Sequence, residues 1–165
     1  QRLQIARNLV TRPRLVFMDE PTSGLDVSVQ ARLLDLLRSL TRHLGLAAIV
    51  VTHDLAVARL LAHRMLVMKE GRAVEQGLTD QVLDDPQHPY TIGLLGSIPR
   101  LDVVRERLST IEGSVPSPAS QPAGCRFAPR CTLAADICRT SLPPRVVTGD
   151  GHEVLCHFAD AEGSR

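Results

Sequence analysis

Hydrophobic and polar residues follow a pattern that predicts alternating helices and strands over the first part of the chain. Apolar residues recur at helical spacing over residues 2–10 and 28–44, and Gly45 ends the second run. Short apolar runs over residues 15–18 and 47–51 are typical of strands in a parallel sheet that is covered on both faces. The pattern therefore predicts an α/β fold with a parallel sheet flanked by helices.

Shorter elements follow this α/β segment. We expect a helix over residues 54–62, a hairpin formed by residues 64–69 and 72–76, and a helix from Thr79, as its cap, to Leu83. Another helix is predicted from His88-Pro89 to Ser97, because proline is well placed in a first helical turn. Proline, serine and charged residues dominate from Pro99 to Ala123, which predicts an extended, partly ordered linker.

Polar side chains follow both predicted strands of the parallel sheet. Asp19 and Glu20 come directly after the first strand, and Thr52-His53-Asp54 follows the second. Ligands of open α/β folds bind at this carboxyl edge of the sheet. Aspartate there suits Mg²⁺, and an adjacent glutamate can act as a base toward water. The alternative is that the two acids only cap the next helix, and the repetition at His53 favours chemistry.

Charge and lysine content narrow the possible functions. The formal net charge is +1, which gives no reason to expect a nucleic-acid partner or attraction to a membrane surface. No apolar run reaches the length of about 18 residues that a membrane span needs, so we expect membrane association only through partners. The one lysine, Lys69, precedes Glu70, so these residues contain no phosphate-binding Gly-Lys-Ser/Thr loop.

The motifs resemble those of ATP-binding cassette (ABC) ATPases. The segment from Met18 to Asp26, Met-Asp-Glu-Pro-Thr-Ser-Gly-Leu-Asp, is similar to the family's Walker B motif and D-loop, and Thr52-His53-Asp54 is similar to its switch histidine. The opening run Gln-Arg-Leu-Gln-Ile-Ala-Arg resembles the helix after the signature motif. The resemblance implies a partial P-loop NTPase fold that uses ATP and Mg²⁺.

This resemblance also implies roles for individual residues. Asp19 would hold Mg²⁺ through water, and Glu20 would polarise the attacking water. His53 would contact the γ-phosphate of ATP, and Asp26 would couple the two sites of an ATPase dimer. Gln1 would support the helix whose amino end faces the opposite phosphate. Because the Walker A loop, Q-loop and signature Ser-Gly-Gly are absent, we expect these 165 residues alone to be inactive.

The family also implies a cellular setting. Its partners would be a second ABC ATPase subunit, identical or homologous, and transmembrane permease subunits, with an extracytoplasmic substrate-binding protein acting indirectly. We expect no nucleic-acid partner. The implied location is peripheral, on the cytoplasmic side of the bacterial inner membrane.

Four cysteines lie in the last quarter of the chain. We expect no disulfides, because a nucleotide-binding cassette works in the reducing cytosol. The close Cys-x2-4-Cys pairs that are usual in zinc sites are missing, and four thiolates on a proline-rich frame suit an iron–sulfur cluster equally well. His152 and His157 are nearby alternative ligands, each expected to be solvated. The residues alone leave zinc and a cluster open for Cys125, Cys131, Cys138 and Cys156.

The tail of the sequence resembles that of oligopeptide and dipeptide importer ATPases. The shared features are His88-Pro89-Tyr90 and the run from Gly124 to Cys131, Gly-Cys-Arg-Phe-Ala-Pro-Arg-Cys. Several members of that group hold a [4Fe–4S] cluster, so the resemblance implies a cluster bound by all four cysteines, with zinc as the alternative. The domains expected are a nucleotide-binding part over 1–87, a helix and linker over 88–123, and an irregular cysteine-rich module over 124–165.

Two other functions compete with peptide import. Residues 1–90 also closely resemble the ATPase-like subunit of the phosphonate carbon–phosphorus lyase system. That subunit normally ends soon after the His-Pro-Tyr region, before the cysteine tail. A non-catalytic, metal-binding interaction module is the third possibility. The complete cysteine tail favours the ATP-hydrolysing subunit of a di- or oligopeptide importer.

Overall fold

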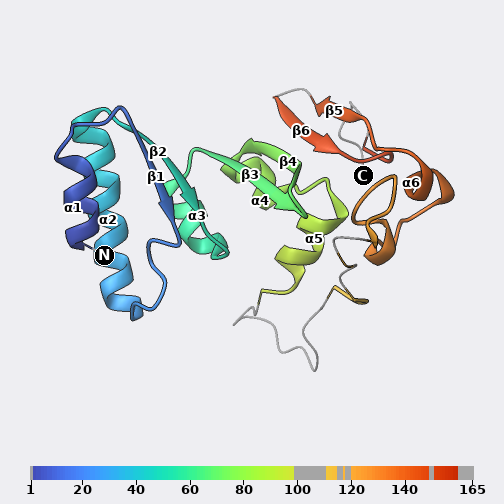
Figure 1. Cartoon of the computed structure of the whole chain (residues 1–165), viewed down its shortest axis with the longest axis horizontal. Coiled ribbons are helices and arrows are strands. Elements are labelled where there is room, and N and C mark those ends of the chain that lie inside the picture. Colours follow the sequence, from blue (N-terminus) through green and yellow to red (C-terminus); the bar gives the residue numbers. More distant parts are fainter. Residues whose placement is uncertain (1, 99–110, 115–116, 118–119, 149–150, 160–165) are drawn as a thin grey trace. The chain divides into compact units, whose positions relative to one another are not determined.

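The computed structural model divides the chain into two compact units, residues 1–63 and 64–165 (Figure 1). The structure describes residues 2–98, 111–114, 117, 120–148 and 151–159. Gln1 and most of the predicted linker lie outside these ranges.

The first unit alternates helices and strands as the hydrophobic pattern predicts. Its elements are α1 (Arg2–Leu9), β1 (Leu15–Asp19), α2 (Val27–Leu44), β2 (Ala47–Val51) and α3 (Leu55–Leu61). Strands β1 and β2 are parallel neighbours, with Leu15 opposite Ala47 and Asp19 opposite Val51 (Figure 1). The predicted α/β fold with parallel strand pairing is therefore confirmed for this unit.

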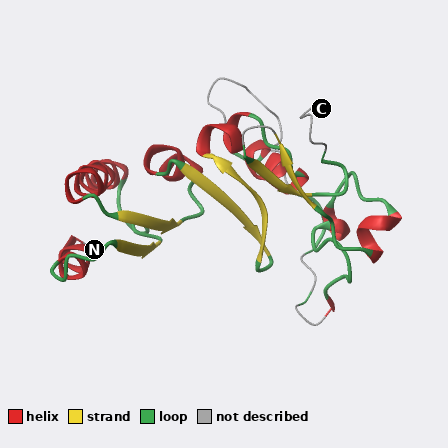
Figure 2. Cartoon of the chain, turned by 90° about the horizontal axis from the view of Figure 1, so that it is seen from above, coloured by secondary structure: helices red, strands yellow, loops and turns green. Residues whose placement is uncertain are grey.

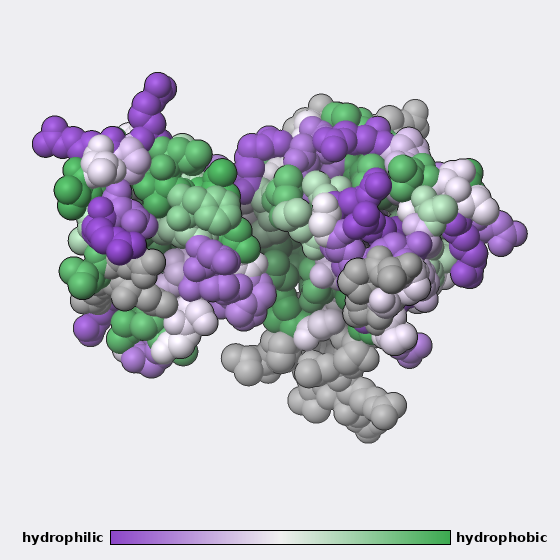
Figure 3. All heavy atoms as spheres, in the orientation of Figure 1, coloured by the Kyte–Doolittle hydropathy of each residue, from purple (hydrophilic) through white to green (hydrophobic). Residues whose placement is uncertain are grey.

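The core of the first unit lies on one face of β1. Val16 and Met18 pack against Leu33 and Leu37 of α2, and apolar residues of α1 and α3 join the same cluster. The intervening Leu15 and Phe17 are 53% and 61% exposed. The expectation of strands covered on both faces is thus wrong for the described residues, because these helices pack their apolar side chains against a single face of the strands. Hydrophobic surface is visible on this unit in Figure 3.

Local sequence explains where the helices of the first unit begin and end. The Asp26 carboxylate accepts a hydrogen bond from the N–H of Val29 and caps α2. Gly45 ends α2 with φ of 60°, a left-handed conformation that glycine adopts without a steric penalty. Asp54 caps α3 by accepting from the N–H groups of Ala56 and Val57. Both loops that lead out of the parallel strands are therefore held by aspartates.

The second unit is built on a four-stranded antiparallel sheet in the order β3-β4-β6-β5. Figure 2 shows the strands of the chain in yellow. Strands β3 and β4 form the predicted hairpin, and β6 pairs with β4 through Glu75 opposite Val154. The elements are β3 (Arg64–Lys69), β4 (Arg72–Leu78), α4 (Thr79–Asp84), α5 (Pro89–Gly96), η2 (Ala128–Arg130), α6 (Asp136–Thr140), β5 (Arg145–Thr148) and β6 (His152–Leu155).

The cysteine-rich segment contributes two of these strands, so it shares a sheet with the hairpin at residues 64–78. The periodicity of the last 40 residues is too weak to indicate β5 and β6, so the sequence predicts an irregular segment there. A separate cysteine-rich domain is not confirmed. The division between the compact units falls after His63, and the segment boundaries at residues 87 and 123 stay predictions.

A small apolar core supports the sheet of the second unit. Val67, Val74 and Val82 are buried together, with Tyr90 and Leu94 of α5 against them. The ring of Tyr90 meets the ring of Phe127 edge-on, with centroids 5.4 Å apart. The predicted helix at His88-Pro89 is thereby packed between the hairpin and the cysteine-rich segment.

The start of α4 differs from the prediction. The N-cap residue of α4 is Leu78 and not Thr79. The side-chain oxygen of Gln81 accepts a hydrogen bond from the N–H of Leu78. Thr79 is the first helical residue and is buried. The prediction failed because a glutamine three residues on took the capping role. None of the helices in the described ranges is both long enough and apolar enough to cross a membrane.

We predict that Leu33→Ala destabilises the first unit by about 2–5 kcal/mol, because it leaves a cavity among Val16, Met18 and Leu37. Urea unfolding followed by circular dichroism at 222 nm measures the change. Leu36→Ala, on the exposed side of the same helix, is the control and should cost about 1 kcal/mol or less. Equal losses from the two substitutions would contradict this core.

Candidate functional site

The carboxyl ends of β1 and β2 bring Glu20 and His53 together. The ring Nδ1 of His53 lies 2.7 Å from Glu20 Oε1, and the backbone N–H of His53 donates to the same oxygen at 3.1 Å. The N–H of Glu20 donates to the carbonyl of Val51, which continues the strand ladder by one residue. The parallel register thus sets a carboxylate beside an imidazole, as the sequence predicted for this edge.

Glu20 has an unusual backbone conformation. Its φ is +45°, in the left-handed region that non-glycine residues seldom adopt. The chain turns sharply there, and the N–H of Ser23 donates to the Glu20 carbonyl. Thr22 is buried within this turn. Such backbone strain concentrates at functional sites, so its position directly after β1 supports a functional reading of Glu20.

Electrostatics couple the two side chains. The hydrogen bond to Glu20, and then the charge of that carboxylate, raises the pKa of His53 above its ordinary value. The His53 side chain is 84% exposed and that of Glu20 is 34% exposed. The pair is therefore open to a solvent-borne reactant, and its energetic coupling is reduced by solvent screening.

The other predicted nucleotide-site residues have different surroundings. Asp19 is the exposed last residue of β1, next to Glu20 in the chain. Asp26 accepts from Ser28 Oγ at 2.7 Å and from the N–H of Val29, and these hydrogen bonds lower the pKa of Asp26. The helix after β1 is therefore capped by Asp26, and not by Asp19 or Glu20 as the capping alternative supposed. Gln1 lies outside the described residues.

Gln30 was not singled out from the sequence. Its amide nitrogen donates to Asp54 Oδ2 at 3.3 Å, which joins α2 to the beginning of α3. The only sequence signal would have been its position one turn after the Asp26 cap. This bond ties α2, the helix that follows the turn at Glu20, to Asp54, the residue after His53.

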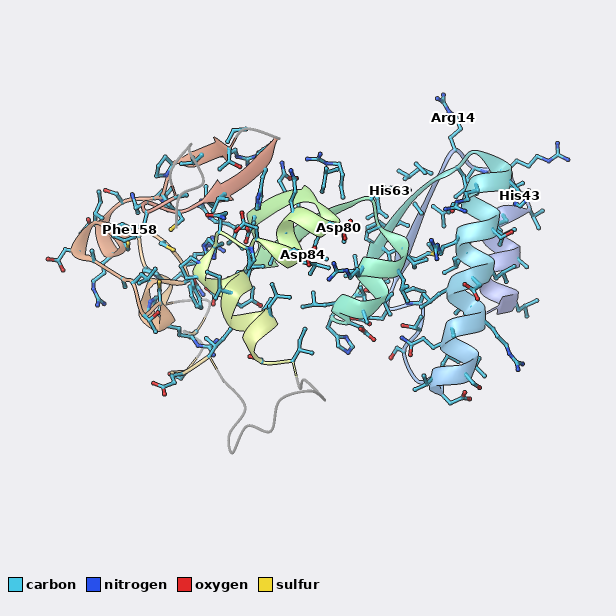
Figure 4. The ribbon with its side chains drawn as sticks, turned by 180° about the vertical axis from the view of Figure 1, so that it is seen from behind. Arg14, His43, His63, Asp80, Asp84 and Phe158 are labelled. Carbon is cyan, nitrogen blue, oxygen red and sulfur yellow. The ribbon has the colours of Figure 1, made fainter. Side chains whose placement is uncertain are left out.

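The four cysteines line one pocket of the second unit, here called the thiol pocket. Its other lining residues include Pro143, His157 and Phe158, and Figure 4 shows sulfur atoms close to the labelled Phe158. All four cysteines are free thiols. Residues separated by up to 31 positions are thus gathered around one cavity: Cys125, Cys131, Cys138 and Cys156.

Close backbone packing forms part of this pocket. The N–H of Cys125 donates to the carbonyl of Cys138 at 2.8 Å. A Cβ atom at Gly124 would collide with the carbonyl oxygens of Cys138 and Ser141. Glycine is therefore required at Gly124 for the two cysteine-bearing segments to approach each other.

Burial controls the protonation of two of the thiols. It raises the pKa of Cys125 and of Cys131, and the neighbouring cysteines add a smaller effect in the same direction. Metal binding at this pocket would have to displace protons from these sulfur atoms. Across the described residues, no three His, Cys, Asp or Glu side chains are arranged to hold a single metal ion.

Glu75 was missed by the sequence analysis. It lies on β4, is 1% exposed, and its Oε1 is 2.8 Å from His152 Nε2. The expectation that His152 is solvated is therefore wrong, because β6 places its ring in the interior against this carboxylate. A single acid in a mixed strand sequence carries no signal of burial. The pairing becomes visible only once β6 is known to join β4.

Two models of known protein families match separate parts of this chain. The family model "Oligopeptide/dipeptide transporter, C-terminal region" matches residues 74–138. A second family model, "AAA domain, putative AbiEii toxin, Type IV TA system", matches residues 2–59. The first match covers β4, α5 and three of the four cysteines, and the second covers Glu20 and His53.

Two curated relatives and one solved structure show the extent of the similarity. The probable peptide ABC transporter ATP-binding protein y4tS of Sinorhizobium fredii is 49% identical over 158 residues, which are 95% of this chain and 45% of the relative. The putative phosphonates utilization ATP-binding protein PhnK of Escherichia coli is 74% identical over 98 residues, 59% of this chain and 39% of the relative.

The structure of CbiO1 from Clostridium perfringens, part of the ABC transporter complex CbiONQ, aligns with a TM-score of 0.48 and 37% identity over 51% of this chain and 34% of that one. The chain spans less than half the length of both curated relatives. The resemblance indicated by the motifs is confirmed: this chain is similar to the C-terminal part of the ATP-binding subunits of ABC transporters, of the oligopeptide and dipeptide importer type.

Proposed function

We propose that this chain is part of an ATP-hydrolysing subunit that energises an ABC importer for di- or oligopeptides. The observation that carries the proposal is the contact between Glu20 and His53 at the carboxyl edge of β1 and β2. Support for peptide import comes from the match at residues 74–138 and from the relative y4tS.

In this proposal each residue at the strand edge has a distinct role. Glu20 orients and polarises the water that attacks the terminal phosphate of ATP. His53 donates a hydrogen bond to the phosphate and stabilises its developing charge. Asp19 has the oxygen ligands that Mg²⁺ prefers and would hold it through water; bound Mg²⁺ neutralises phosphate charge. Asp26 would couple the site to a second ATPase subunit.

The remaining parts of the site would come from outside these 165 residues. We infer that a phosphate-binding loop and a signature motif are supplied by the N-terminal half of the protein and by a second subunit. Permease subunits, and indirectly an extracytoplasmic binding protein, complete the importer. The proposed location is the cytoplasmic side of the bacterial inner membrane.

The thiol pocket is proposed to hold a [4Fe–4S] cluster through its four cysteines. In favour of a cluster, all four thiols line one cavity, and four thiolates are a usual ligand set of iron–sulfur clusters. The same four thiolates could instead hold zinc, which stays the alternative. When bound, the cluster would supply a structural or regulatory cross-link between segments that are distant in sequence.

The second candidate function is an ATPase-like subunit of a phosphonate uptake or carbon–phosphorus lyase system. The 74% identity to PhnK over 98 residues specifically favours it. Both functions use the same strand-edge site, so the choice depends on the cysteine-rich segment and on the transported substrate.

We predict that Glu20→Gln in the full-length protein lowers kcat for Mg²⁺-dependent ATP hydrolysis by about 10²–10⁴-fold, because the amide cannot accept a proton from water. The KM for ATP should change little. A phosphate-release assay in the presence of the partner subunits measures both. Asp35→Asn, on the exposed surface of α2, should keep wild-type activity. The 165-residue chain alone should show no turnover.

We predict that Glu20 raises the pKa of His53 above 6.5 in the folded chain. Because the folded pKa lies above the unfolded value, the contact stabilises the folded state fully below pH 6.5, and this contribution is lost as the pH rises through the raised pKa. NMR titration of the His53 ring should show a lower pKa in Glu20→Gln. An unchanged pKa, matching that of the Asp35→Asn control, would refute the coupling.

We predict that anaerobically purified protein contains about four irons and four acid-labile sulfides per chain, with visible absorption, and that Cys131→Ser loses them. Elemental analysis and spectroscopy are the measurements. Thr132→Ser, at the exposed neighbouring position, should retain the metal. Stoichiometric zinc would replace the cluster assignment, and metal-free thiols would refute the site.

A further inference from the structure

Glu75 lies at the centre of a buried hydrogen-bond group in the second unit. Its Oε1 accepts from the N–H of Gln87 at 2.6 Å and from His152 Nε2 at 2.8 Å. Its Oε2 accepts from the N–H of His88 at 3.1 Å. A carboxylate oxygen accepts, so the ring of His152 serves as the donor through Nε2 in this contact.

Two of the bonded segments lead directly to the thiol pocket. His152 begins β6, and Cys156 follows the end of that strand. His88 precedes Pro89, and both line the pocket beside the cysteines. The imidazole of His88 is buried, accepts from the N–H of Tyr90, and lies 5.9 Å from the ring of Phe127.

We propose that Glu75 is a positioning residue for the thiol pocket: one carboxylate fixes both the strand that presents Cys156 and the His88-Pro89 wall. The inference rests on the proposed metal site and adds a residue outside the cysteine-rich segment to it. Groups that orient metal ligands typically change metal affinity by about 10- to 100-fold when replaced.

The carboxylate is required because of the number of donors around it. Burial of an acid is costly unless hydrogen bonds satisfy it, and three donors converge on Glu75 here. Glutamine has nearly the same shape but presents an NH2 group in place of one oxygen. One of the three donors would then face another donor, and its segment would be released.

The test uses full-length protein, made metal-free and reduced, and then reconstituted anaerobically with ferrous iron and sulfide. We expect Glu75→Gln to lose the visible cluster absorption about tenfold faster than wild type when a ferrous chelator is added. Glu153→Gln is the matched control, because it removes a carboxylate of the same sheet that pairs with Arg145 closer to the surface. It should behave as wild type.

A second pair of variants separates positioning from general folding. His152→Leu removes the donor from β6 but keeps a side chain of similar volume, whereas the Gln side chain in His152→Gln can still donate to Glu75. We expect rapid iron loss from the first and near wild-type retention by the second. If His152 only filled space, the two variants would behave alike.

Each outcome decides the proposal. Fast loss from Glu75→Gln and His152→Leu, with retention by His152→Gln and Glu153→Gln, supports it. Equal retention by Glu75→Gln and wild type overturns it and leaves the pocket intact. If Glu75→Gln does not fold, equal behaviour of the two His152 variants overturns the proposal. If the wild-type protein takes up neither the cluster nor zinc, the proposed metal site is refuted. The proposed positioning role of Glu75 is then refuted as well.

Discussion

The buried carboxylate of Glu75 is the interaction on which the second unit depends. It receives hydrogen bonds from β6 and from the two residues before α5. The other contacts that join the hairpin β3–β4 to the cysteine-rich segment include the short β4–β6 pairing and a hydrogen bond from Arg126 to the carbonyl of Glu70. This carboxyl group is tolerated in the interior because three hydrogen bonds satisfy its oxygens. The same requirement makes the arrangement specific, since few other side chains accept three hydrogen bonds at once.

In the first unit, backbone geometry positions the candidate site at the edge of β1 and β2. Parallel pairing brings the ends of β1 and β2 to the same edge, and the left-handed residue Glu20 turns the chain there. Aspartates then start both following helices, so the two loops leave the sheet in fixed conformations. The proposed chemistry therefore uses side chains whose backbone is held by strands, caps and one strained residue.

Sequence reasoning succeeded where the signal is local. Periodicity located α2 and β2, Gly45 marked the end of a helix, and the acids after β1 indicated the edge where Glu20 meets His53. It failed where partners are distant in the chain. The antiparallel pairing of Glu75 with Val154 joins residues 79 positions apart. No sequence pattern near either residue predicts this pairing. The open face at Leu15 and Phe17 was also missed, since an apolar run indicates burial without showing which element covers it.

The edge-on packing of Tyr90 against Phe127 has a spectroscopic consequence. These 165 residues contain one tyrosine and no tryptophan, and the tyrosine belongs to the second unit. Intrinsic ultraviolet fluorescence of this chain therefore reports on residues 64–165 alone, while far-ultraviolet dichroism sums over both units. Comparison of the two signals during denaturation would show whether the parallel strands and the cysteine-bearing sheet unfold together or in separate steps.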